Sequence, residues 1–136
     1  MLVYDRQKEL LEWASLQLFG EPDGWDDKAV AIGVELEGKI IAVVVYTNYH
    51  PQMIEMHIAS VDSRWASRYN LRRFFLYPFS QLGLGRVQAI LAASNERAIS
   101  MAKRLGFTYE GYHPQAFIGG VDAVSYGMLK HQCKWL

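Results

Sequence analysis

The chain has 136 residues, of which 51% are hydrophobic, and its 14 basic and 14 acidic side chains leave no formal net charge. This length suits one domain with a single core, and the apolar content excludes a disordered chain. The balanced charge argues against a general nucleic-acid binder, which needs a basic face.

The cysteine content and the N-terminal charges bear on location. Cys133 is the single cysteine, so no internal disulfide can form, and a reducing compartment is indicated. Charged residues between Asp5 and Glu9 stand where a signal peptide needs an apolar core. No apolar run approaches the roughly 20 residues that cross a bilayer. We therefore expect one cytoplasmic domain over residues 1–136, with no membrane partner.

The first part of the chain predicts a strand, a helix and a hairpin. Residues 2–4 form a short strand, and residues 5–19 carry apolar side chains at helical spacing up to Gly20. The loop GEPDGWDD, residues 20–27, gathers acidic side chains around Trp25. Residues 30–36 and 39–46 are apolar strands joined at Glu37-Gly38, and the second is apolar enough to be buried on both faces.

A strand, a helix and another strand follow. Residues 52–61 have a two-residue period that places Glu55 and His57 on one face. Residues 64–82 predict a helix rich in aromatic side chains. Pro78 should kink that helix or end it early, because proline lacks an N–H and crowds the preceding turn. Residues 86–93 predict the next apolar strand.

The stretch NERAISMAKRLGFTYEG, from Asn95 to Gly111, is the most distinctive in the chain. Asn95 can cap a helix, and the apolar residues behind it share one helical face. Gly106 suits the left-handed end of that helix. Phe107 and Tyr109 then resume the period of a strand. Residues 121–129 form a last strand after a turn at Gly119-Gly120.

The order of elements predicts an α/β fold. Strands and helices alternate in the middle of the chain, which implies a central parallel strand pair with right-handed crossovers. The outer hairpins are antiparallel. We therefore predict a mixed sheet with antiparallel outer hairpins around a central parallel pair, and helices on both faces.

This order and the capped helix resemble the GNAT superfamily, the acyl-CoA-dependent N-acetyltransferases. The positions that carry the resemblance are Asn95, Ala98, Leu105, Gly106, Phe107, Glu110 and Gly111. The spacing between Gly106-Phe107 and Glu110-Gly111, followed by Asp122 and Tyr126, is most similar to that of the ribosomal-protein N-terminal acetyltransferase branch. The resemblance is sharp over residues 53–129 and only topological before them, where an acidic loop replaces the usual second small helix.

The resemblance implies acetyl-CoA as co-substrate and a primary amine as acceptor: a protein N-terminus, a lysine or a small amine. The acetyl group would pass by direct attack in a ternary complex. Relatives are often dimers, and a homodimer is left open. The alternative is a GNAT-fold protein of weak or lost activity that binds CoA or takes part in an assembly.

The resemblance also implies how the co-substrate is held. Pantetheine would pair with the free backbone edge of residues 53–61, at Ile58, Ala59 and Val61. Asn95 could contact the pantetheine or the adjoining phosphates. The family's glycine-rich pyrophosphate loop has no counterpart, because residues 64–71 contain no glycine.

Other residues of this loop could replace the glycines. Ser67 lies within it, and Arg64, Arg68 and Arg72 recur every four residues, as one stripe of a helix. Guanidinium groups pair well with phosphate oxygens. The alternative is that these arginines form a solvated helix face.

Acetyl transfer needs a neutral amine, so a base must remove its proton. Glu55 and His57 are the candidates, since they share a strand face beside the thioester site; a solvent-exposed surface is the alternative. The tyrosine that protonates the leaving thiolate in many relatives is replaced by Ala102. A thiol needs little help in leaving, and Tyr126 is a candidate acid or a core tyrosine.

The acidic loop and the histidines are two further groups that could carry chemistry. The acidic loop, Glu21 to Asp27, could attract a cationic amine, or it could simply be solvated. The four histidines and Cys133 show no metal-ligand spacing, so no metal is predicted.

Overall fold

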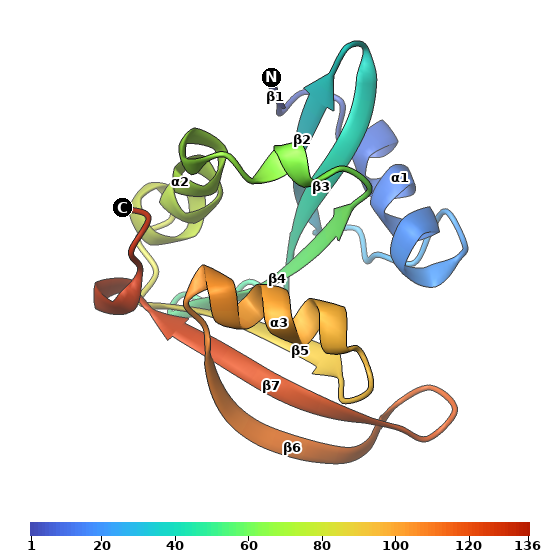
Figure 1. Ribbon diagram of the computed structural model, residues 1–136, viewed down its shortest axis with the longest axis vertical. Coiled ribbons are helices and arrows are strands. Elements are labelled where there is room, and N and C mark those ends of the chain that lie inside the picture. The colour runs from blue at the N-terminus through green and yellow to red at the C-terminus, as the bar shows by residue number, and fades with distance from the viewer.

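The computed structural model describes residues 1–136 and contains one seven-stranded sheet in the order β1-β2-β3-β4-β5-β7-β6 (Figure 1). The strands are β1 (Leu2–Val3), β2 (Val30–Leu36), β3 (Lys39–Thr47), β4 (Met53–Ser60), β5 (Arg86–Ala92), β6 (Thr108–Phe117) and β7 (Val121–Leu129). Neighbouring strands are antiparallel except β4 and β5, which are parallel. The predicted mixed α/β sheet with a central parallel pair is confirmed.

Three α-helices cover the sheet: α1 (Gln7–Phe19), α2 (Arg68–Leu76) and α3 (Glu96–Leu105). Figure 1 shows α1 on one side of β2–β4, with α2 and α3 on the opposite side of the sheet. Helices therefore lie on both faces, as predicted. No helix is both long and apolar enough to cross a membrane.

Two hydrophobic cores lie on the two sides of β3. Ala42, Val44 and Tyr46 join the larger core under α2 and α3, and Val43 and Val45 join the smaller core under α1. Successive residues of a strand point to opposite faces, so β3 needs apolar side chains on both. This explains its nearly continuous run of β-branched residues.

The helix predicted over residues 64–82 is divided into three parts. Ser63–Ala66 form a 3-10 turn, Ser67 is extended, and α2 begins at Arg68. The Ser67 hydroxyl accepts a hydrogen bond from the Asn70 N–H at 3.1 Å, so it caps a new helix. The prediction that Arg64, Arg68 and Arg72 form one helical stripe is therefore wrong, because Arg64 lies before the break.

Pro78 ends α2 early, as predicted. The helix stops at Leu76 and continues as a wide π-helical turn over Tyr77–Gln81. The Leu82 N–H bonds to the Tyr77 carbonyl at 2.9 Å, one residue further back than in an α-helix. The missing N–H and bulky ring of proline account for the change of helix type.

The ends of α3 also agree with the sequence. The Asn95 side chain accepts a hydrogen bond from the Ala98 N–H at 3.1 Å. Gly106 closes the helix with φ of 107°, in the left-handed region that glycine favours. The cap and the stop place α3 beside the point where β4 and β5 separate.

Candidate active site

The parallel strands β4 and β5 pair only over Met53–Glu55 and Arg86–Gln88. Beyond these residues β4 continues to Ser60 and β5 to Ala92 without facing each other. Backbone groups on the inner edge of β4 are therefore left without a strand partner. Such groups can bind an extended ligand by strand addition.

Strand register decides which residues of β4 offer those groups. The Val61 N–H bonds to the Ile41 carbonyl at 2.9 Å, on the side of β3. Because alternate residues bond to opposite edges, Ala59 also faces β3, while Met56, Ile58 and Ser60 face the gap. Ile58, one of the predicted backbone partners of pantetheine, therefore faces the gap, whereas Ala59 and Val61 face β3 and cannot offer their backbone groups there.

A cavity of about 350 Å³ fills the gap between the separated strands. Its walls come from the end of α1, from β4, β5 and α3, and from Phe107 and Phe117. Fourteen of its 17 lining residues are hydrophobic, so its chemistry depends on the remaining three: Glu55, His57 and Asn95. The structure thus brings the two predicted bases and Asn95 to one cavity.

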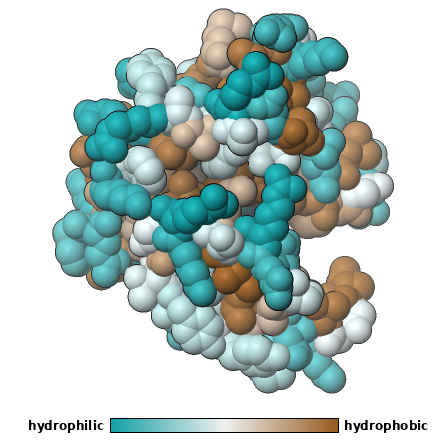
Figure 2. Space-filling model, viewed as in Figure 1, coloured by the Kyte–Doolittle hydropathy of each residue, from teal (hydrophilic) through white to brown (hydrophobic).

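The cavity passes through the sheet. Four consecutive residues of β4, Glu55 to Ile58, line it, and consecutive side chains of a strand point to opposite faces. Leu18 and Phe19 of α1 line it on one face, and α3 lines it on the other. Figure 2 shows the surface notched at the right, between the end of α1 and the β6–β7 hairpin. Two molecules can therefore reach the same gap from opposite sides.

Glu55 is held by a chain of side chains that come from three strands, β4, β5 and β6. Gln88 Nε2 donates to a Glu55 carboxylate oxygen at 3.1 Å, and Arg86 donates to Gln88 Oε1 at 3.0 Å. Arg86 also pairs with Glu110 through two hydrogen bonds, which lower the pKa of the Glu110 carboxyl. Glu110 lies over Gly127, where a Cβ atom would collide with its carboxylate.

His57 lies against aromatic and hydroxyl groups. Its Nε2 atom is 2.8 Å from the Thr47 hydroxyl, and its ring meets the Trp25 ring edge-on, with centroids 5.0 Å apart. The indole N–H of Trp25 donates to the Leu11 carbonyl at 3.0 Å. Burial lowers the pKa of His57, so the imidazole is neutral at neutral pH and able to accept a proton.

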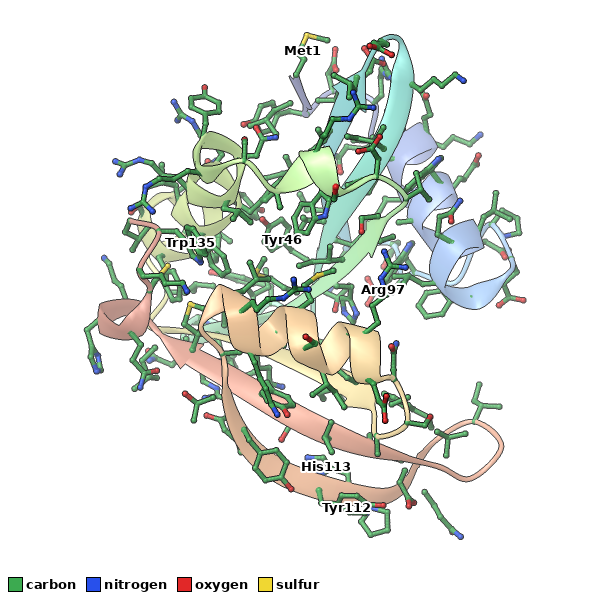
Figure 3. The ribbon with its side chains drawn as sticks, viewed as in Figure 1. Met1, Tyr46, Arg97, Tyr112, His113 and Trp135 are labelled. Atoms are coloured by element: carbon green, nitrogen blue, oxygen red, sulfur yellow. The ribbon has the colours of Figure 1, made fainter.

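A second cavity, of about 300 Å³, continues from the first. The two share Met101 and Leu105 in their walls. The second is lined by Ser60, Ser63, Arg97, Arg104 and Trp135, among others, and none of its lining residues is acidic. In Figure 3, Arg97 rises from α3 toward the gap between α3 and α1. This second cavity offers cationic groups beside the free edge of β4.

Two of the arginines predicted as phosphate ligands, Arg64 and Arg68, have partners within the chain. The Arg64 guanidinium binds Asp62 at 2.7 Å, and this hydrogen bonding lowers the pKa of Asp62 to about 2. The Arg68 guanidinium stacks over Trp135, 5.7 Å from the ring centroid. Ser67 caps α2, and neither Ser67 nor Arg72 lines the second cavity.

Arg97 and Arg104 were not predicted as site residues. Together with Met101 they follow an i, i+4, i+7 spacing, so all three share one face of α3. This spacing is the feature of the sequence that could have identified Arg97 and Arg104 as neighbours on one helical face.

Tyr126 is not brought to the site. It is 4% exposed in the larger core, with its ring 5.7 Å from that of Tyr109, and it does not line the cavity. Ala102 does line the cavity. At this position the chain therefore offers only a methyl group to the cavity.

The acidic loop lies elsewhere. Asp23, Asp26 and Asp27 line an open groove along the outer side of α1, and none of them lines the cavity between β4 and β5. Trp25 lies between the groove and the cavity, in contact with both Phe19 and His57. No group of three or more His, Cys, Asp or Glu side chains could hold a metal ion.

No family model matches the sequence, and no curated protein matches it. Solved structures do match the fold. A mutant form of the spermidine N-acetyltransferase SpeG from Vibrio cholerae superposes with a TM-score of 0.74 and 21% identity, over 100% of this chain and 97% of that chain. A probable acetyltransferase gives a TM-score of 0.66 and 23% identity over 78% of this chain. This chain covers 63% of that second structure, less than two thirds of its length.

Proposed function

We propose that this protein, whose fold is that of the GNAT acetyltransferases, transfers an acetyl group from acetyl-CoA to a primary amine. The observation that carries the proposal is the cavity that crosses the sheet between β4 and β5. It lets a donor and an acceptor meet from opposite faces in a ternary complex.

Direct attack by the amine is favoured over an acyl-enzyme. None of the residues that line the cavity is a cysteine, serine or lysine. Cys133 lies outside the cavity near the end of the chain, and burial raises the pKa of its thiol. A less acidic thiol forms less of the nucleophilic thiolate.

The residues present fit a pantetheine arm and its phosphates. Met56, Ile58 and Ser60 face the gap with backbone groups that can pair with the amides of pantetheine. Arg97 and Arg104 line the adjoining cavity and would hold phosphate oxygens. These side chains would replace the amide cradle that a glycine-rich loop provides.

Acetyl-CoA supplies an acetyl group on a thioester, whose carbonyl carbon a neutral amine attacks. Glu55 and His57 lie on the same face of β4 and both line the cavity, so either can accept the proton that the amine must lose. A backbone N–H on the free edge of β4 can donate to the carbonyl oxygen as negative charge develops. With Ala102 in place of an acid, the thiolate takes its proton from water, which a thiol of pKa near 8.5 permits.

Thermal unfolding with and without acetyl-CoA tests the proposal. A ligand that binds only the folded protein must raise the melting temperature, by an amount that grows with its concentration. The same samples are then assayed for acetylated product with a panel of amines and peptides. Acetyl-pantetheine, which lacks the phosphates, is the matched ligand and should give a smaller rise.

Each outcome has a separate meaning. A rise in melting temperature with product supports the transferase. A rise without product on any amine supports the alternative, a CoA-binding protein that has lost efficient catalysis. No rise at millimolar acetyl-CoA overturns the proposal.

A further inference from the structure

We infer that the acceptor is a monoamine carried on an apolar body, and not a polyamine. The inference rests on the proposed function and names the substrate class of the same site. It comes from the mouth of the cavity on the α1 face, which lies opposite the face where α3 and the arginines would hold the donor.

This mouth is formed by large apolar side chains that water still reaches. Leu18 and Phe19, at the end of α1, are 42% and 49% exposed, and Phe117, at the end of β6, is 37% exposed. All three line the cavity. Exposed apolar side chains gathered at the opening of a cavity mark a binding surface for an apolar group.

The charges of the cavity limit the acceptor to one amino group. Glu55 is the only acidic residue among the lining residues, and it already accepts a hydrogen bond from Gln88. The aspartates of the 20–27 loop face the outer groove, with Trp25 between them and the cavity. A second ammonium group inside would have no carboxylate partner, and an unpaired charge is strongly disfavoured in an apolar site.

The size of the cavity also limits how much of the acceptor can enter it. Its volume of about 350 Å³ must also hold the reacting end of the donor, so only the amine and the first atoms of the acceptor enter. The rest of an apolar acceptor would lie against Phe19 and Phe117. A polyamine would instead place further charged groups against these rings and aliphatic side chains.

The proton balance needs no other reactant. The acceptor enters as an ammonium ion and first loses one proton through Glu55 or His57 to solvent. Its neutral nitrogen then bonds to the acetyl carbon as the carbon–sulfur bond breaks, and it gives up its second proton to water. The departing thiolate takes a proton from water and leaves as the thiol of CoA, so one proton is released in total.

The test compares phenethylamine, ethanolamine and spermidine as acceptors at fixed acetyl-CoA. We expect kcat/KM for phenethylamine to exceed that for spermidine by about 10-fold or more, the discrimination typical of an apolar pocket. Phe117→Ser should lower kcat/KM for phenethylamine by about 10-fold and leave that for ethanolamine within about two-fold. Tyr69→Ser, at an aromatic residue 62% exposed on α2 and outside the cavity, is the control and should change neither.

The inference is overturned if spermidine is the better substrate, or if Phe117→Ser lowers all three values equally at an unchanged melting temperature. It is also overturned if Phe117→Ser alters only the choice between acetyl-CoA and hexanoyl-CoA, because the apolar mouth would then serve the donor. Good turnover of spermidine would leave the proposed function intact. Failure of the proposed function appears separately, as no rise in melting temperature with acetyl-CoA.

Discussion

Gln88 Nε2 on β5 lies 3.1 Å from a carboxylate oxygen of Glu55 on β4, where the two parallel strands part. Side chains thus join the strands at the last point before the backbones separate. Arg86 fixes the far end of Gln88, and Arg86 is itself held by Glu110 on β6. Glu110 is one of the residues that pointed to the fold in the sequence. In the structure it ends the chain of side chains that orients Glu55, a candidate base.

Replacing Gln88 by leucine should slow the reaction without weakening the donor complex. The carboxylate of Glu55 would lose the donor that orients it, so we expect kcat to fall by about 10-fold and KM for acetyl-CoA to stay unchanged. Glu55→Gln should lower kcat by about 100-fold or more if Glu55 is the base. Gln81→Leu, at an exposed glutamine outside the cavity, is the control. A rise in KM for acetyl-CoA with kcat unchanged would show that Gln88 acts on binding instead.

The stability of the protein should fall as the pH drops below the ordinary pKa of histidine, partly because of His57. Burial lowers the pKa of His57 in the folded state, so the unfolded chain takes up a proton first on acidification. The titration of His57 does not affect the free energy of unfolding above about pH 6.5. Below that pH it lowers the free energy of unfolding, until the pH has fallen through the folded-state pKa of His57. His57→Gln removes the titrating group.

We therefore expect the melting temperature to drop less between pH 7 and pH 5 in His57→Gln than in the wild type. His113→Gln is the control, because His113 is exposed on β6. Equal drops in the wild type and His57→Gln would mean that folding does not lower the pKa of His57, which would contradict its burial beside Trp25.

The sequence predicts best what short-range backbone geometry decides. The cap at Asn95 and the stop at Gly106 follow from local rules and are confirmed. The sequence did not predict the helix break at Ser67, because a serine is tolerated inside a helix and becomes a cap only when the chain turns. A motif that is read from one segment alone thus gives the fold more surely than the site.

The site depends on register and on contacts between distant segments. The two-residue period of β4 fixes which side chains share a face, but the edge to which each N–H points follows from pairing with β3. Arg97 and Arg104 line the second cavity only because α3 packs beside Ser60 and Ser63. No local pattern in residues 64–72 could reveal that arginines of another helix line this cavity.

Removing positive charge from α3 should weaken the binding of CoA. We expect Arg97→Gln and Arg104→Gln each to raise the dissociation constant of CoA by about 10-fold, because each arginine can donate to a phosphate. Calorimetric titration at two salt concentrations checks this, and the variants should also show a weaker salt dependence. Arg73→Gln, at an arginine stacked on Tyr69 outside this cavity, is the matched control.

The earlier candidates among the arginines are tested in the same way. Arg64 is held by Asp62, and neither Arg64 nor Arg72 lines the second cavity, so we expect a change of less than about two-fold in the dissociation constant for Arg64→Gln and Arg72→Gln. Arg68→Gln can act through Trp135, which lines the cavity, and should give an intermediate change. Larger effects of Arg64 or Arg72 than of Arg97 and Arg104 would contradict the placement of the phosphates.

The two roles of Asn95 can be separated by two substitutions. Asn95 caps α3 through its bond with the Ala98 N–H, and it also lines the cavity. Asn95→Ala should lower stability by about 1 kcal/mol, or about 3 °C in melting temperature, because the N–H loses its partner. Asn95→Ser keeps a capping oxygen and should stay close to the wild-type melting temperature.

If Asn95 also contacts the donor, both substitutions should raise the dissociation constant of acetyl-CoA by several-fold, since serine cannot reproduce the amide. If the residue serves only as a cap, Asn95→Ser should bind acetyl-CoA as the wild type does. The comparison works because the two variants differ in helix capping and agree in lacking the amide. Loss of affinity in Asn95→Ala alone would assign the effect to fraying of α3, which carries Arg97 and Met101 in its first turns.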